Sequence, residues 1–220
     1  MMVMLRLYED TFPGDGGLDG ALPAMPRVLF VVHGSIRIEG RELRDGDTWF
    51  GQNAVSLAPG SAGVTLWRFE LALAAAAAGM ARGPGVISHE KISAPLKQLP
   101  QGDLLMRGDS VGFPPGGCAY LHTHQGPGIR CLVEGGIRID THDRSASYGP
   151  GGAWFESGPE PVFAQAADRP TRFIRVMILP RTLLGKSSIS YVNEDDKAKP
   201  KSQQYKIFVD APIALAAADG

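Results

Sequence analysis

The sequence predicts an all-β protein made of two successive copies of one small barrel. Glycine and proline together form about a fifth of the 220 residues, with 28 glycines and 17 prolines. Segments that alternate apolar and polar residues are short and are separated by turn sequences, which is typical of sandwiches and barrels. No segment has the pattern of a long amphipathic helix. The second half of the chain also repeats the first.

The first half reads as a series of short strands. We expect an opening strand over residues 3–8, a buried apolar strand over 27–32 and an alternating strand over 35–39. Two more strands begin at Thr48 and Val64. The segments between them are rich in glycine, proline and aspartate, the residues that turns favour. Regular spacing of strands and turns therefore predicts one barrel in this half.

The repeat consists of three segments that recur in the same order. The matched pairs are 33–39 with 134–140, 46–50 with 151–155, and 66–69 with 173–176. Repeated segments in a fixed order indicate a duplicated structural unit. We therefore predict two domains, an N-terminal barrel over residues 1–82 and a C-terminal barrel over residues 83–220. After Pro180 we expect further strands at 187–192 and 205–209, separated by a polar loop.

Composition restricts the class of protein. The net charge of −1 provides no basic field for a nucleic acid. No apolar run reaches the roughly 18 residues that a membrane-spanning helix needs. The first ten residues lack the basic start of a signal peptide and include early acidic residues. We expect a cytoplasmic protein with neither a nucleic-acid partner nor a membrane segment.

One pair of histidines is the strongest sign of chemistry. His122 and His124 are two residues apart in a segment that turn sequences bound on both sides. Side chains at i and i+2 of a strand point to the same face, so both imidazoles should converge and could share a metal ion. The corresponding positions of the first copy are Ala21 and Pro23. The sequence thus predicts the site in the second copy only.

These features resemble the cupin superfamily. The resemblance rests on the His-x-His strand, a following apolar strand that ends in Glu-Gly, and a later P-G-G-x-W-F run. The first cupin motif is filled by Gly116 or Gly117, His122, His124 and Gly135. With its two copies the chain resembles a bicupin: two tandem double-stranded β-helix barrels with few short helices. The resemblance implies a divalent metal ion (Fe, Mn, Ni or Zn) held by three histidines and a glutamate.

Two of those four ligands are missing. Gly128 or Ile129 stands at the position of the glutamate, and Pro161 or Val162 near that of the last histidine. Glu156 is the first candidate for a third ligand, because two histidines and a carboxylate form a set suited to Fe(II). A solvated glutamate at a strand end is the alternative. Weaker candidates are Glu160, Gln125 and His89.

Two further residues could bind a ligand. In the cupin frame Arg130 lies on the inward face, where a buried arginine requires an anionic partner. It could bind a substrate carboxylate, or it could equally pair with Glu156. Tyr120 should share the face of the histidine pair and line the pocket. Arg68 and Arg175 recur in both copies, and we expect them to be structural.

Two functional hypotheses follow. The first is a metal-binding bicupin; the sequence does not decide whether it is an enzyme, and the resemblance would imply a dioxygenase or isomerase acting on a small organic acid. The second is a non-catalytic cupin module that binds a small metabolite or acts as an oligomeric scaffold. In both cases we expect the partner to be a small-molecule ligand, with a carboxylate as the leading candidate. We also expect a homodimer formed through the edges of the barrels.

Overall fold

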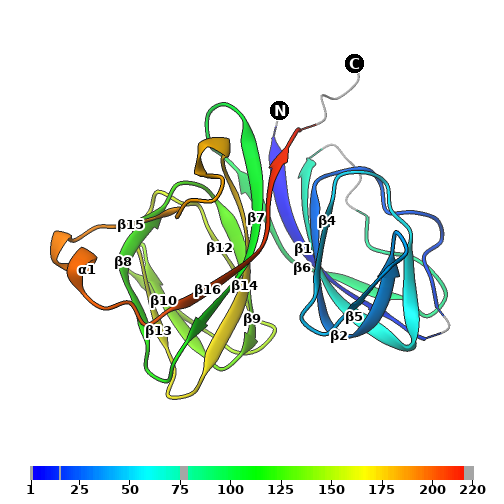
Figure 1. The fold of residues 1–220 in the computed structure, drawn as a ribbon, viewed down its shortest axis with the longest axis horizontal. Helices are drawn as coiled ribbons and strands as arrows, with labels where there is room; N and C mark the ends of the chain where they lie inside the picture. The colour runs from blue at the N-terminus through cyan, green and yellow to red at the C-terminus, as the bar shows by residue number, and fades with distance from the viewer. Residues whose placement is uncertain (1, 15, 75–78, 216–220) are drawn as a thin grey trace. The chain divides into compact units, whose positions relative to one another are not determined.

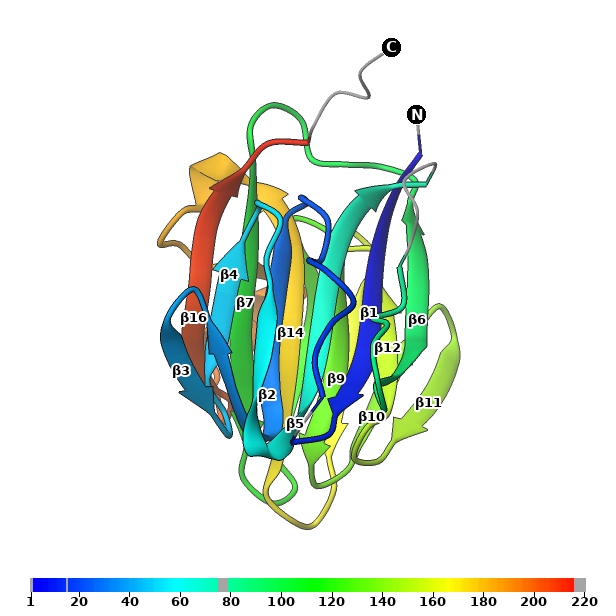
Figure 2. The same cartoon turned by 90° about the vertical axis from the view of Figure 1, so that its right-hand side faces the viewer.

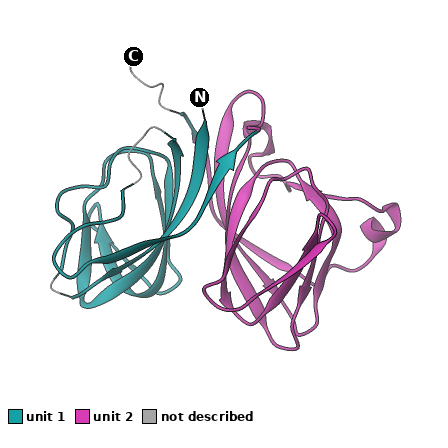
Figure 3. Ribbon diagram, turned by 180° about the vertical axis from the view of Figure 1, so that it is seen from behind, with its two compact units in different colours: residues 1–97, 213–220 teal, residues 98–212 magenta. Residues whose placement is uncertain are grey.

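The computed structural model of the protein describes residues 2–14, 16–74 and 79–215 (Figure 1). In this part of the chain β-strands far outnumber helices, which are one five-residue α-helix and one short 3-10 helix. The chain divides into two compact units, residues 1–97 with 213–220 and residues 98–212 (Figure 3). The predicted all-β fold of two successive barrels is therefore confirmed.

The first unit is built from one six-stranded antiparallel sheet. Its strands are β1 (Val3–Phe12), β2 (Arg27–Ile38), β3 (Arg41–Arg44), β4 (Thr48–Gly51), β5 (Leu57–Leu73) and β6 (Ile87–Leu96). They follow the order β3-β2-β5-β1-β6, with β4 paired to β2. Figure 2 shows β2, β5 and β1 side by side. The opening strand thus lies inside the sheet and has a partner on each side.

Alternation along these strands separates the core of the first unit from its surface. A buried cluster includes Phe12 of β1, Leu29 of β2, Leu66 of β5 and Trp49 of β4. Leu29 is in register with Trp49, so these two side chains face the same interior. Trp49 is therefore a core residue of the first unit.

The second unit has two five-stranded sheets. Its elements are β7 (Leu104–Phe113), β8 (Cys118–His124), β9 (Gly128–Glu134), β10 (Ile137–Thr141), β11 (Arg144–Tyr148), β12 (Ala153–Glu156), β13 (Val162–Ala166), β14 (Thr171–Pro180), η1 (Arg181–Leu183), β15 (Ile189–Tyr191), α1 (Glu194–Ala198) and β16 (Gln204–Ile213). One sheet has the order β11-β10-β13-β8-β15 and the other β12-β9-β14-β7-β16. Apolar side chains of both sheets, among them Leu132, Ile139, Trp154 and Phe173, form its core.

The last strands are added to the edges of these sheets. β15 pairs with the histidine strand β8, and β16 is next to β7. Arg107 of β7 holds β16 through Asp210, with Nε to Oδ1 at 3.0 Å and Nη2 to Oδ2 at 2.9 Å. The same guanidinium donates to the carbonyls of Leu183 and Lys186, both at 2.7 Å. The strands expected near 187–192 and 205–209 are present, and the polar loop between them contains α1.

The division between the units differs from the predicted boundary. The sequence places it after residue 82, whereas the first unit extends to Lys97. β6 is the reason, because it pairs with β1 over nearly its whole length, from Val3 with Leu96 to Thr11 with Ile87.

No described helix has the length and apolarity that crossing a membrane requires.

Candidate functional site in the second barrel

Strand β8 presents the two histidines of the candidate site. His122 and His124 are both 5% exposed, and their ring centroids are 4.8 Å apart with the planes at 80°. β15 covers this strand from the side, with Tyr191 in register with His122 and Ile189 with His124. The Tyr191 ring lies 6.4 Å from that of His122. The two imidazoles are therefore close together and largely excluded from solvent.

A backbone hydrogen bond fixes the His122 tautomer. The Nδ1 atom of His122 lies 2.7 Å from the carbonyl oxygen of Tyr120, so Nδ1 carries the proton. Nε2 is then the acceptor nitrogen of a neutral ring. This contact occurs at an irregularity in β8, where Val162 pairs with His122 but Ala164 with Ala119.

That irregularity displaces Tyr120. The extra residue in β8 is a β-bulge, which interrupts strict alternation of faces. Tyr120 therefore does not follow the pattern that placed it beside the histidines. Its ring lies instead beneath the ammonium groups of Lys199 and Lys201, at 4.9 and 5.5 Å. Its role in binding a substrate stays a prediction that these contacts do not support.

Glu156 enters the site from β12 and is already engaged. Trp154 donates from Nε1 to Oε1 of Glu156 at 2.8 Å. Arg130 forms an ion pair with Oε2, with Nη2 at 2.7 Å. His124 is farther away, with Nε2 at 3.7 Å from the same oxygen. Of the two roles left open for Arg130, the structure contains the pairing with Glu156.

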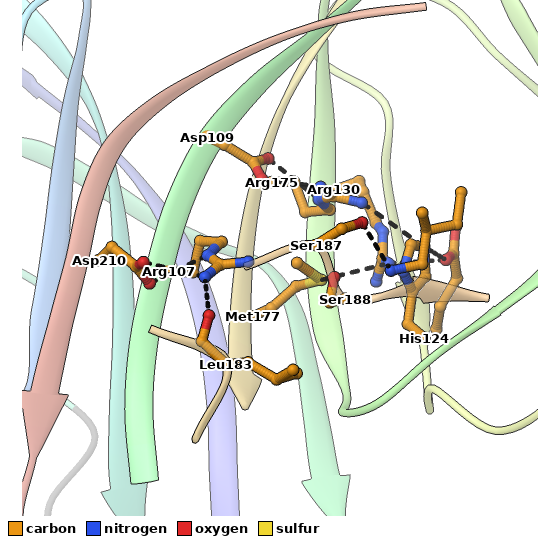
Figure 4. A network of polar contacts seen from close by, with 12 residues as sticks. Arg107, Asp109, His124, Arg130, Arg175, Met177, Leu183, Ser187, Ser188 and Asp210 are labelled. Atoms are coloured by element: carbon orange, nitrogen blue, oxygen red, sulfur yellow. Dashed lines mark hydrogen bonds and ion pairs between the residues drawn. The ribbon is translucent and has the colours of Figure 1, made fainter. Parts of the chain in front are cut away.

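A second ion pair, which the sequence interpretation missed, completes the site. Arg175 of β14 binds Asp109 of β7 with two hydrogen bonds, Nε to Oδ1 at 3.0 Å and Nη2 to Oδ2 at 2.7 Å. Its Nη1 lies 3.5 Å from Nε2 of His124. Figure 4 shows both residues within this network of polar contacts. Arg175 was expected to be structural only. A signal for Asp109 was present, because a carboxylate inside a strand bounded by apolar residues requires a partner when the strand is buried.

Strand register explains how these charges meet. Arg130 is in register with Trp154 on one side and with Arg175 on the other, and Arg175 with Asp109. Paired residues of an antiparallel sheet point to the same face, so these side chains form one row across β12, β9, β14 and β7. The histidines come from the other sheet. The site is thus a charged row opposed by two imidazoles.

Burial and charge determine the protonation states. Burial lowers the pKa of Arg130 to about 10; Glu156 opposes this fall, and the neighbouring Arg175 adds to it. Burial also acts against the charge of Arg175, but the pair with Asp109 outweighs it and holds the pKa above its usual value. Burial lowers the pKa of His122, and burial together with Arg175 and Arg130 places that of His124 well below its usual range. Both imidazoles are therefore neutral.

These histidines should make stability depend on pH. The folded pKa values are depressed, so the unfolded chain takes up protons below about pH 6.5 that the folded chain does not. The free energy of unfolding will therefore fall as the pH drops from 6.5 toward the folded values, by up to about 1.4 kcal/mol per pH unit for each histidine. Urea unfolding between pH 7.5 and 5.5 measures this slope.

Two variants isolate the effect. His124→Gln should flatten the slope of unfolding free energy against pH. The control is His142→Asn, at an exposed position, which should leave the slope unchanged. Asn is chosen there because it tolerates the positive φ of 51°. Equal slopes in wild type and His124→Gln would show that this ring is not a neutral buried group.

The arrangement does not suit the metal ion that the resemblance implies. Within the described residues no three His, Cys, Asp or Glu side chains are grouped so that they could hold one. Glu156 is occupied by Arg130 and Trp154, and His124 Nε2 faces a guanidinium. A divalent cation here would lie beside two buried positive charges. Nε2 of His122 is an acceptor nitrogen, because Nδ1 donates to the Tyr120 carbonyl.

The weaker candidates lie elsewhere. Gln125 and His89 are exposed, and His89 belongs to the first unit. Glu160 lines a separate hollow of about 550 Å³ on the second unit. The other residues of that hollow are Leu121, Asp140, Thr141, His142, Asp143, Arg144, Ser145, Pro161 and Phe163. These three candidates therefore do not join the histidine pair.

Comparisons with known proteins identify the fold. Neither a protein-family model nor a curated protein sequence matches the chain. AerE from Microcystis aeruginosa is similar in structure at 14% identity, with a TM-score of 0.57 over 81% of this chain and 88% of that one. An 11S allergen from Cocos nucifera has 10% identity and a TM-score of 0.60 over 86% and 83%.

A third similar structure is a deletion mutant of the oxalate decarboxylase OxdC from Bacillus subtilis. It has 13% identity and a TM-score of 0.60 over 89% of this chain and 73% of that one. At such identities the likeness concerns the fold alone. The chemistry of the site depends on the residues that this chain places there.

Proposed function

Because the chain has the cupin fold, we propose that its second barrel binds a small organic acid through Arg130 and Arg175 and needs no resident metal ion. The observation that carries the proposal is a pair of buried guanidinium groups in register on neighbouring strands, Arg175 of β14 and Arg130 of β9. Burial, with the neighbouring Arg175 adding to it, lowers the pKa of Arg130 to about 10. An added anion would oppose that fall, because a nearby negative charge favours the charged form.

The chemistry of the row suits a carboxylate. The planar fork of a guanidinium binds a carboxylate with two parallel hydrogen bonds, and such bonds are strong in a buried site. Neutral His122 would accept a hydrogen bond at Nε2 from a hydroxyl group of the same ligand. The protein would then act as a metabolite-binding module that distinguishes hydroxy acids from simple acids.

Removing Arg130 tests this proposal. In calorimetric titrations with a panel of small carboxylic and hydroxy acids, Arg130→Met should weaken binding of the responsive acid about 10- to 100-fold. That range corresponds to the loss of a charged hydrogen bond worth roughly 1.5–3 kcal/mol. The matched control is Arg138→Met, since Arg138 of β10 is half-exposed and pairs with Asp140. Equal affinities in the two variants would overturn the role of Arg130.

A metal-dependent activity is the second candidate, favoured by one observation. Metal-binding histidines commonly donate their other ring N–H to a backbone carbonyl, as His122 does to Tyr120. His122, His124 and Glu156 would then hold Fe, Mn, Ni or Zn, and the implied reactions are dioxygenation or isomerisation of a small organic acid. The ion pairs of Arg130 with Glu156 and of Arg175 with Asp109 would first have to break.

Elemental analysis separates the two candidates. Protein purified without chelator or affinity tag and then offered Fe, Mn, Ni and Zn should retain far less than one ion per chain. Near-stoichiometric metal that is lost in His122→Ala, but kept in His142→Asn, would contradict the proposal and establish the metal-dependent alternative.

A further inference from the structure

The first barrel contains its own buried charged cluster. Six polar side chains on β1, β2 and β5 are each at least nine-tenths buried: Arg6, Tyr8, Asp10, Arg27, Arg68 and Glu70. Arg6 and Arg27 are both in register with Glu70, and Tyr8 with Arg68. By alternation these residues share the face of Phe12, Leu29 and Leu66, which belong to the core. The cluster therefore lies inside this barrel.

Two carboxylates compensate two of the three arginines. Arg68 donates to both oxygens of Asp10, at 2.6 and 3.2 Å, and pairs with Glu70 at 2.8 Å. Arg27 donates from Nε to Glu70 at 3.0 Å and from Nη2 to the Pro23 carbonyl at 2.6 Å. With three guanidinium groups and two carboxylates, the cluster has a net charge of +1.

The third arginine has no such partner. In the described chain no carboxylate forms an ion pair with Arg6. Within this cluster three buried polar atoms lack a hydrogen bond: Arg6 Nε, Arg27 Nη1 and Tyr8 Oη. Burial raises the pKa of Tyr8 to about 12, and Arg6 is near enough to oppose that rise. Tyr8 therefore keeps its proton and is a donor. Glu90, in register with Tyr8 on β6, is exposed.

Donors without partners in a buried site point to a missing acceptor. A buried polar group that lacks a hydrogen bond is strongly disfavoured, more so when it is charged. Water could accept these hydrogen bonds, but it would not cancel the surplus positive charge. We infer that the first barrel binds a small, singly charged oxyanion of the carboxylate class at Arg6, Arg27 and Tyr8. This site is separate from the one in the second barrel.

The full-length protein can be tested with acetate as the probe. Calorimetric titration should be carried out in wild type and in Arg130→Met, so that binding in the second barrel is distinguished from binding in the first. In the Arg130→Met protein we expect acetate binding that Arg6→Met, added to it, weakens at least tenfold. Arg41→Met is the matched control, since Arg41 of β3 is exposed in the same unit. Acetate binding that Arg6→Met leaves unchanged would overturn the inference.

Tyr8→Phe guards against a folding defect in Arg6→Met. This variant removes one donor and keeps the ring that packs against the Arg68 guanidinium at 4.3 Å. It should weaken acetate binding three- to tenfold, yet unfold in acetate-free buffer at no lower temperature than wild type, because the lost hydroxyl had no partner. Unchanged acetate affinity in Tyr8→Phe would contradict the site. Sulfate binding more tightly than acetate would contradict the single surplus charge.

Discussion

Replacing Asp109 by alanine should reduce the free energy of unfolding by about 3–5 kcal/mol, the range observed when one partner of a buried ion pair is removed. Asp109 is 2% exposed and accepts both hydrogen bonds of the Arg175 fork. Without it, Arg175 remains buried beside Arg130 and the neutral His124. Urea unfolding at pH 7.5 measures the loss.

An exposed pair in the same unit is the matched control. Asp103 and Arg181 are 3.4 Å apart with most of both side chains in solvent. Asp103→Ala should change the free energy of unfolding by less than about 0.5 kcal/mol. Adding Arg175→Met to Asp109→Ala should recover part of the lost stability, because the charge without a partner is then also removed. Equal losses in Asp103→Ala and Asp109→Ala would show that Arg175 is not desolvated.

Truncating Trp154 to alanine should cost about 3–5 kcal/mol, as large-to-small changes at buried aromatic residues do. Trp154 is 3% exposed, stacks on Tyr148 with centroids 4.8 Å apart and meets the edge of Phe173 at 5.2 Å. The change would leave a cavity in the core and also remove the hydrogen bond to Glu156. Chemical denaturation monitored by far-ultraviolet circular dichroism measures the loss.

Trp154→Phe separates packing from hydrogen bonding. Phenylalanine keeps an aromatic ring in the core but cannot donate to Glu156 Oε1. Its cost should be clearly smaller than that of alanine, about 1–3 kcal/mol. A phenylalanine variant as unstable as the alanine variant would contradict packing as the main contribution.

The fold could be predicted because its signals are local. Strands, turns and the repeat of 33–39 at 134–140 are all visible in short stretches of sequence. The boundary between the two units could not be predicted in the same way, because it depends on pairing between distant segments. Nothing in residues 87–96 alone indicates that they lie beside β1 and not in the second unit.

The site shows the same contrast between local and distant information. The proximity of His122 and His124 follows from a spacing of two within one strand. The pairing of Arg130 with Glu156 was foreseen only as an alternative, because register between β9 and β12 decides it. Asp109 was missed because its pairing with Arg175 depends on the register between β7 and β14. Tyr120 was expected on the same face as the histidine pair. One extra residue in β8, which no sequence pattern indicates, interrupts the alternation of faces between Tyr120 and the histidines.

The position of β1 has a consequence for folding during synthesis. β1 pairs with both β5 and β6, which follow it in the chain, and its closing pair is Val3 with Leu96. The edge of β1 that faces β6 therefore stays open until the chain has been translated as far as Leu96. Such distant pairing is slow, and an open strand edge can pair with other chains. In a nascent first barrel this edge of β1 would thus be exposed to pairing with other chains until β6 emerges.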